Sequence, residues 1–304
     1  MTDSPQSEVP AVGSDENAMR AFDDGSWLRL GRYCAACARW VDKSDSAHLS
    51  IELPARLWIY TNYDCNLQCA YCLVSSNPYA ERRALGLDRF RTLFNEARQL
   101  GVRELFLTGG EPLLLDEIFE MISLATPHVR TTLLTNALLA RGRRLEKLLA
   151  VNHANLFIQV SVDDDQPGLH DKYRGEGTWQ RTVDAMDALR AAGFQLRVAS
   201  TVTPELAPKV VALRRFVRDR LQIGEADHIV RPLLRRGFSE EGMAVGKADL
   251  VPELTVDASG IFWHPAGTDS DLLVSADTGS LKRALEEVTR ISLARTASPL
   301  QPFR

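Results

Sequence analysis

The sequence contains no apolar run long enough to cross a bilayer and no excess of basic residues. Its 36 Lys and Arg residues against 40 Asp and Glu residues leave a net charge of −4, which argues against a general nucleic-acid-binding protein. No segment has the features of a signal peptide, so we expect a cytoplasmic protein without a membrane or nucleic-acid partner. The 304 residues, 45% of them hydrophobic and 25% charged, suit a globular protein with one barrel-sized domain and extensions.

Cysteine is also scarce: five are present, and none follows Cys72. An odd number of cysteines without a signal peptide does not favour a disulfide framework. Three of the five, Cys65, Cys69 and Cys72, form the spacing Cys-x3-Cys-x2-Cys. A structural zinc site usually takes four ligands from two Cys-x2-Cys pairs, and no second pair or His pair follows closely. Three thiolates this close instead suit three irons of a 4Fe-4S cluster, which leaves the fourth iron open for chemistry.

A second motif, Gly109-Gly110-Glu111-Pro112, follows a short apolar strand. Together the two motifs resemble the signature of the radical S-adenosylmethionine (radical SAM) superfamily. The resemblance implies a 4Fe-4S cluster on Cys65, Cys69 and Cys72, whose open iron chelates the amino and carboxylate groups of S-adenosylmethionine (SAM). Enzymes of this family cleave a carbon–sulfur bond of SAM with one electron, and the 5′-deoxyadenosyl radical then abstracts hydrogen from the substrate. An electron donor such as flavodoxin or ferredoxin is implied as well.

The chain alternates short apolar strands with amphipathic helical patterns, which predicts an α/β fold with a parallel sheet and right-handed crossovers. The family resemblance makes this a partial, six-unit TIM-like barrel with its active site at the carboxyl ends of the strands. We expect an acidic disordered tail over 1–25, an N-terminal extension over 26–52, the barrel over 53–240 and a C-terminal extension over 241–304. The expected strands cover 57–60, 104–108, 132–135, 156–162, 195–202 and 227–231, and the expected helices cover 87–100, 116–125, 141–151, 178–192 and 204–220.

Several cofactor-binding residues follow from the resemblance. Tyr71 precedes the third cysteine and is expected near the adenine or the cluster, or else is an ordinary core tyrosine. Gly109 and Gly110 lack side chains where the backbone must approach a ligand closely, and with Glu111 they are implied to bind the methionine amino group. Asn136 closes the third strand and is also placed in the cofactor site.

Polar residues after the fourth strand form a second group. Ser161 and Asp163 point to the same side of the strand, and the resemblance places them on the ribose hydroxyls or the methionine carboxylate. Their alternative role is to cap a helix or brace the loop. Arg174 is expected to pair with the methionine carboxylate in a charge-assisted fork, or to form a surface ion pair with Asp171 or Glu176.

Three arginines lie at the end of the sixth strand: Arg231 closes it, and Arg235 and Arg236 follow it. They are candidates for an anionic substrate subsite, and the alternative is that they are solvated. No residue is identified as a further catalytic group.

The C-terminal region has the outline of the SPASM or twitch extension of radical SAM enzymes, with a hairpin over 254–262 and a helix over 280–288. That extension normally carries cysteines for auxiliary clusters, but Trp263-His264-Pro265 stands where a cysteine is expected. We therefore expect no conventional auxiliary cluster there.

The remaining cysteines, Cys34 and Cys37, have the Cys-x2-Cys spacing that chelates a metal but do not complete a site. One interpretation is a second metal or cluster completed by Asp45, His48, His264 or a partner chain. A redox or hydrogen-donor thiol pair and inert structural cysteines are the two others.

Among functions, the SPASM outline favours radical modification of a peptide or protein. The alternative is a small-molecule reaction, such as epimerisation or rearrangement of a sugar, a nucleoside or another natural product. A non-catalytic iron–sulfur scaffold would predict a damaged cluster or cofactor motif, and both motifs are intact.

Overall fold

The computed structural model describes residues 32–34, 39–41, 55–246, 250–276 and 279–297. Its main feature is a nine-stranded sheet with the strand order β11-β10-β9-β3-β4-β5-β6-β7-β8. The six expected strands are all present and parallel, which confirms the α/β class and the open, partial barrel. They are β3 (Arg56–Tyr60), β4 (Glu104–Thr108), β5 (Arg130–Thr135), β6 (Leu156–Ser161), β7 (Gln195–Val202) and β8 (His228–Pro232).

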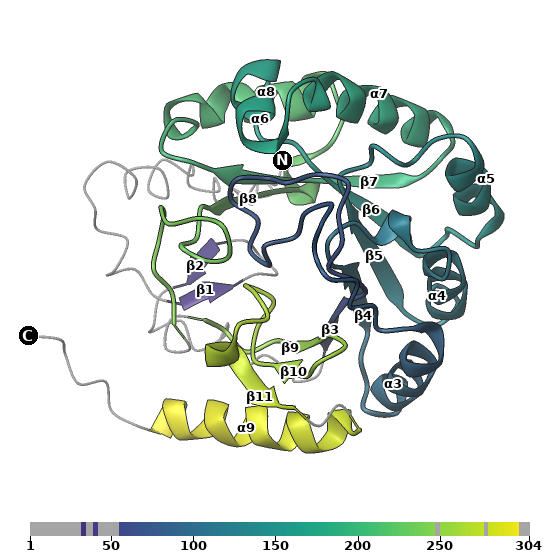
Figure 1. Ribbon diagram of the computed structural model, residues 1–304, viewed down its shortest axis with the longest axis vertical. Helices are drawn as coiled ribbons and strands as arrows, with labels where there is room; N and C mark the ends of the chain where they lie inside the picture. The colour runs from purple at the N-terminus through teal and green to yellow at the C-terminus, as the bar shows by residue number, and fades with distance from the viewer. Residues whose placement is uncertain (1–31, 35–38, 42–54, 247–249, 277–278, 298–304) are drawn as a thin grey trace, which may run out of the picture.

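The helices lie on the outer, convex side of the curved sheet (Figure 1). One of them, α6, was not expected from the sequence, because Pro167-Gly168 and the charged residues after it obscure the apolar period. The α-helices along the barrel are α3 (Leu87–Gln99), α4 (Ile118–Ala125), α5 (Arg143–Ala150), α6 (Pro167–Arg174), α7 (Thr178–Ala191) and α8 (Val210–Asp219). Short 3-10 turns are η2 (Pro112–Leu114), η3 (Ala207–Lys209), η4 (Glu225–Asp227) and η6 (Ser270–Leu272).

The alternation of side chains along β3 separates the core from the barrel interior. Leu57 and Ile59 are fully buried in the hydrophobic core with Phe90 of α3. Trp58 and Tyr60 point to the opposite face, where both line a cavity. A strand of period two therefore supplies apolar packing on its outer face and site residues on its inner face.

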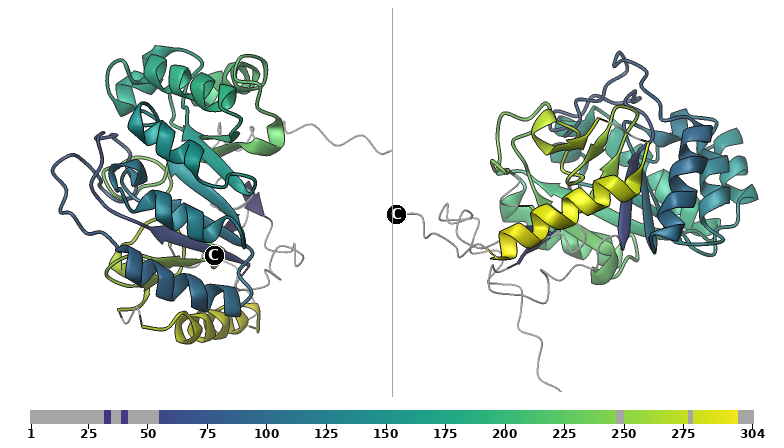
Figure 2. Two further views of the ribbon diagram at one scale, coloured as in Figure 1. Left: turned by 90° about the vertical axis from the view of Figure 1, so that its right-hand side faces the viewer. Right: turned by 90° about the horizontal axis from the view of Figure 1, so that it is seen from below.

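The C-terminal extension continues the sheet. The expected hairpin is β9 (Leu254–Val256) and β10 (Ile261–Phe262), and β9 pairs in parallel with β3. The third strand, β11 (Leu273–Ser275), follows, and α9 (Leu281–Ala297) lies across this edge of the molecule (Figure 2). Within the described residues, no helix is both long and apolar enough to cross a membrane.

The N-terminal region contributes one small antiparallel pair, β1 (Arg32–Cys34) and β2 (Arg39–Val41), with Cys34 opposite Arg39. Cys37, the acidic tail over 1–25, Asp45 and His48 lie outside the described residues. The three interpretations of Cys34 and Cys37 therefore stay predictions, and so does the division into four regions.

Candidate active site

The carboxyl ends of the parallel strands surround one cavity. Side chains from the cysteine loop, from β3 to β8 and from the C-terminal extension line it. Its lining includes Cys65, Cys69, Tyr71, Cys72, Gly109, Gly110, Asn136, Ser161, Arg174, Thr201, Arg231 and His264. Residues from all along the barrel, expected separately from the sequence, thus face the same space.

The three cysteine thiols are free, and they are buried or half-buried. Burial raises the pKa of Cys65 to about 12 and also raises the pKa of Cys69, although Arg174 acts to lower the latter. Backbone N–H groups point at two of the sulfurs: Leu67 N lies 3.4 Å from Cys65 Sγ and Ser76 N lies 3.3 Å from Cys72 Sγ. Thiols in such an environment become thiolates when a bound metal centre supplies positive charge.

This donor set fits a 4Fe-4S cluster better than a single ion. Within the residues that the structure describes, no three His, Cys, Asp or Glu side chains gather tightly enough to hold one metal ion. A four-iron cluster places each thiolate on a different iron, so three sulfurs surround a volume and do not converge on a point. Soft thiolates with backbone donors aimed at them are the ligands that such clusters take.

Gly109 and Gly110 hold the cysteine loop against the end of β4. Gly109 has φ +146°, and a Cβ there would lie 2.5 Å from the backbone oxygen of Asn62. A Cβ on Gly110 would lie 2.1 Å from the backbone oxygen of Asp64, directly before the first cysteine. The glycines were expected to allow a ligand to approach the backbone. The close neighbour in the structure is the chain's own backbone, although both residues also line the cavity.

Glu111 is fully buried and turns into the protein. Its carboxylate accepts hydrogen bonds from Leu113 N (3.0 Å), Thr135 Oγ1 (2.7 Å) and Asn136 N (2.8 Å). Burial raises the pKa of Glu111, and these hydrogen bonds act in the opposite direction. The carboxylate ties the end of β4 to the end of β5 and so positions Asn136.

Asn136 in turn reaches the cysteine loop. Its Nδ2 donates to Asn66 Oδ1 at 2.8 Å and lies 3.9 Å from Cys65 Sγ. The two motifs of the sequence are therefore connected through Glu111 and Asn136.

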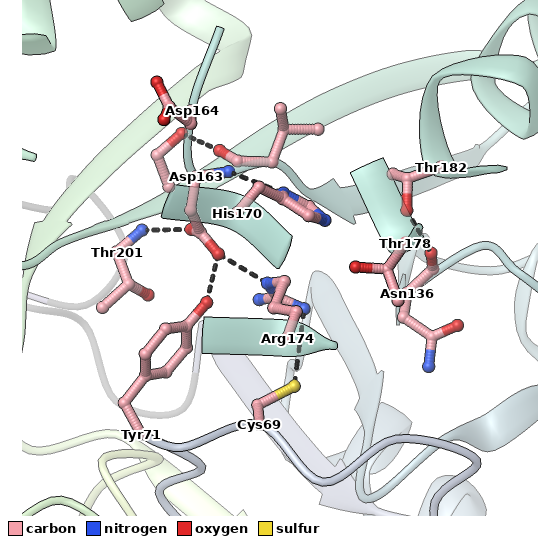
Figure 3. A network of polar contacts seen from close by, with 12 residues as sticks. Cys69, Tyr71, Asn136, Asp163, Asp164, His170, Arg174, Thr178, Thr182 and Thr201 are labelled. Carbon is pink, nitrogen blue, oxygen red and sulfur yellow. Dashed lines mark hydrogen bonds and ion pairs between the residues drawn. The ribbon is translucent and has the colours of Figure 1, made fainter. Parts of the chain in front are cut away.

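A buried polar network lies beside the cavity (Figure 3). Asp163 accepts hydrogen bonds from the Tyr71 hydroxyl and from Thr201 N (2.7 Å), and it forms an ion pair with Arg174. The Arg174 guanidinium also points at Cys69 Sγ, 4.0 Å from Nη1. Burial opposes ionisation of Asp163, but Arg174 and the other donors lower its pKa, so the carboxylate is charged. The Asp163 carboxylate, the Arg174 guanidinium and the Cys69 sulfur thus form a spatial row from the end of β6 to the cysteine loop.

Asp163, the observed ion-pair partner of Arg174, was not among the partners expected from the sequence, Asp171 and Glu176. Asp171 accepts hydrogen bonds from Gly177 N (2.9 Å) and Trp179 N (2.7 Å) and so holds the start of α7. Ser161, at the end of β6, lines the cavity.

Of the three candidate arginines, Arg231 within β8 lines the cavity, and Arg235 and Arg236 after β8 do not. Arg235 is exposed, and Arg236 forms ion pairs with Asp269 (2.9 Å) and Asp271 (2.6 Å). Arg236 therefore braces the C-terminal extension.

Some lining residues were missed from the sequence, notably Trp58 and Tyr60 of β3. The Tyr60 hydroxyl donates to Pro265 O at 2.9 Å and joins the first barrel strand to the C-terminal extension. The period-two pattern of β3 was the available signal, since it places both side chains on the face opposite Leu57 and Ile59.

Comparison with known proteins agrees with this geometry. The model of the radical SAM superfamily matches residues 59–208. The AdoMet-dependent heme synthase of Methanosarcina barkeri is 29% identical over 187 residues, 61% of this chain and 52% of the relative. Mycofactocin maturase MftC of Mycolicibacterium smegmatis is 29% identical over 145 residues (47% and 36%), and PqqA peptide cyclase of Rhodopseudomonas palustris is 25% identical over 197 residues (62% and 51%). The chain spans about half the length of these curated relatives, or less.

Solved structures share the fold. anSMEcpe with bound AdoMet and Kp18Cys peptide has a TM-score of 0.62 at 13% identity, over 81% of this chain and 84% of that one. SuiB of Streptococcus suis bound to precursor peptide SuiA has a TM-score of 0.54 at 18% identity, over 83% of this chain and 49% of that one.

Proposed function

Because this chain belongs to the radical SAM superfamily, we propose that it is an enzyme that reductively cleaves SAM at a 4Fe-4S cluster held by Cys65, Cys69 and Cys72. One observation carries the proposal: three free cysteines and the Gly109-Gly110 backbone line one cavity at the carboxyl ends of a parallel sheet. When bound, the cluster supplies the electron for carbon–sulfur cleavage, and the resulting 5′-deoxyadenosyl radical abstracts hydrogen from the substrate.

The residues of the cavity bind, orient and shield. We propose that the strand-end backbone at Gly109 and Gly110 receives the methionine ammonium group, and that Glu111 acts indirectly by positioning Asn136. We propose that the hydroxyl of Ser161, which lines the cavity, binds the ribose. Tyr71 contributes its ring to the cavity wall, while Asp163 anchors its hydroxyl.

Arg174 has a double role in this proposal. Its charge is held by Asp163, and its free donors face Cys69 and the cavity, where the methionine carboxylate would complete its hydrogen bonds. We also propose a flavodoxin or ferredoxin as electron donor and the cytoplasm as the compartment.

For the substrate, we propose a peptide or protein. Two observations support this proposal. The proteins similar in sequence to this chain include a maturase and a peptide cyclase, and the chain shares its fold with SuiB. A small-molecule substrate is the second candidate, because the heme synthase matches a similar share of the chain. A short precursor-peptide gene beside this one would support the first, and sugar- or nucleoside-processing genes would support the second.

The first experiment is anaerobic reconstitution with iron and sulfide, followed by dithionite and SAM. We expect bound iron, brown colour and 5′-deoxyadenosine from the wild-type protein, detected by liquid chromatography and mass spectrometry. Cys69→Ala removes one cluster ligand, so it should lose the barrel iron and reduce 5′-deoxyadenosine formation at least a hundredfold.

The matched control is Cys34→Ala, a cysteine outside the trio, which should keep SAM cleavage. Iron content and SAM cleavage at wild-type levels in Cys69→Ala would contradict the assignment. So would a wild-type protein that is colourless, iron-free and still active.

A further inference from the structure

A second cavity lies behind the first, toward the amino ends of the strands. Arg56, Glu104 and Arg130, which open β3, β4 and β5 as register partners, stand at its border. Trp58 and Arg231 line both cavities. The first cavity has a volume of about 190 Å³ and the rear cavity a volume of about 210 Å³.

The rear cavity is positively charged. Four guanidinium groups line it, those of Arg56, Arg130, Arg197 and Arg231. Arg56 and Arg130 share the carboxylate of Glu104, with N···O distances of 2.9 and 3.5 Å.

Arg197 pairs with Asp227 at 3.0 Å. Arg231 makes no side-chain hydrogen bond or ion pair with another residue of the described part of the chain. Arg231 is therefore the guanidinium of this group that is available to an anion.

A second observation, independent of charge, points to a ligand. Gln159 on β6 is 3% exposed and lines the rear cavity, and its Oε1 has no hydrogen-bond partner among the described residues. Barrel interiors are usually filled by apolar side chains, and a buried carboxamide without a partner is costly. An N–H donor from a bound molecule would satisfy it.

We propose that the rear cavity is a substrate subsite that binds an acidic side chain of a peptide. The carboxylate would pair with Arg231, and a neighbouring peptide N–H would donate to Gln159 Oε1. A phosphate could also pair with Arg231, but a peptide segment supplies both the carboxylate and a backbone N–H donor, and it is the substrate class of the proposed function. Because Trp58 and Arg231 border both cavities, a peptide can place one residue near the cysteines and an acidic residue behind Trp58. This inference rests on the proposed function, since it names what the substrate must carry.

The test uses the reconstituted protein with SAM and a random octapeptide library as the probe. Peptides retained by the wild-type protein should be enriched at least tenfold in Asp or Glu over their content in the input, as read by mass spectrometry. Arg231→Gln should remove that enrichment, because the neutral amide cannot form the ion pair. The matched control is Arg235→Gln, an exposed arginine of the same segment, which should keep the enrichment.

A second variant changes the other residue of the proposed subsite. Gln159→Glu preserves size and places a negative charge beside the proposed carboxylate, so it should also abolish the enrichment. The proposal would be overturned if the wild-type protein showed no acidic enrichment or if the enrichment persisted in Arg231→Gln. It would also be overturned if the wild-type protein bound inorganic phosphate and retained no peptide. Cleavage of SAM by the wild-type protein without peptide reports on the proposed function separately, because a protein that cleaves SAM but shows no acidic enrichment contradicts the subsite alone.

Discussion

Arg174 shows how single residues hold the candidate site together. The residue is 8% exposed, and its guanidinium lies between the Asp163 carboxylate and the Cys69 sulfur. An unpaired guanidinium in such a place would be strongly unfavourable, so the carboxylate is the condition for burying it. The same carboxylate orders the Tyr71 ring, and one acidic residue therefore positions two cavity-lining side chains.

Asp163→Asn should lower the free energy of unfolding by about 3 to 5 kcal/mol, because it leaves Arg174 charged and buried without its partner. The measurement is anaerobic chemical denaturation followed by circular dichroism. Asp184→Asn, an exposed carboxylate on α7, serves as the control and should change stability by less than about 0.5 kcal/mol.

The double variant Asp163→Asn/Arg174→Gln distinguishes lost charge pairing from a packing defect. It should recover part of the lost stability, because neither charge then remains buried. A double variant that is as unstable as the sum of the two single variants would contradict an energetic coupling between them.

At the scale of elements, α9 depends on a residue of α3. Glu96 accepts hydrogen bonds from Ser280 Oγ, Leu281 N and Lys282 N, each near 3 Å, and so caps the first turn of α9. These backbone hydrogen bonds lower the pKa of Glu96 against the opposing effect of burial. A carboxylate at this position also faces the positive end of the helix dipole. The C-terminal extension is thus attached to the barrel through its helix as well as through β9.

Glu96→Gln should release the first turn of α9 by about 1 kcal/mol, because the neutral amide loses the charge and one acceptor. Hydrogen exchange of the amides at 281–284 should become about fivefold faster. Asp88→Asn, on the exposed side of α3, is the matched control and should leave these amides unchanged. Equal exchange in wild type and Glu96→Gln would rule out the cap.

At the scale of the whole molecule, the barrel is half open and its own C-terminal extension supplies part of the wall. Trp263 is fully buried and bonds through its backbone to η6. Tyr63 hydrogen bonds to Asp257 and Thr268 of the same region. Trp263, directly after β10, thus packs a large apolar side chain into the core of the extension.

The same burial predicts sensitivity to mild acid. Desolvation lowers the pKa of His170 and His228 to about 4 and that of His264 to about 3, each with a nearby arginine contributing. The pKa in the unfolded chain is about 6.5, so below that pH the unfolded state binds more protons than the folded state. Stability is therefore full above about pH 6.5 and falls as the pH drops toward 4.

We expect the melting temperature to decrease between pH 7 and pH 5, with a smaller decrease in His228→Gln than in the wild-type protein. The glutamine keeps the hydrogen bond to Ser200 and cannot take up the proton. His128→Gln removes an exposed histidine and should retain the wild-type slope. An identical pH slope in His228→Gln would contradict the assignment of acid sensitivity to buried histidines.

Features that depend on local spacing could be predicted from the sequence. They are the cysteine trio, the Gly-Gly-Glu-Pro motif and the order of six strands, because short-range spacing and hydrophobic periodicity define each of them. The positions of Asn136 and Ser161 at strand ends follow from the same pattern, since parallel strands present their carboxyl ends on one edge.

The contacts between side chains that are far apart in the chain became known from the three-dimensional structure. It paired Arg174 with Asp163 where the sequence offered nearer carboxylates, turned Glu111 inward onto β5, and joined β9 to β3. It also brought Gln159 and Arg231 to the rear cavity. These pairings depend on which strands are neighbours and on the cost of burying polar groups, and neither quantity can be read from residues adjacent in the chain.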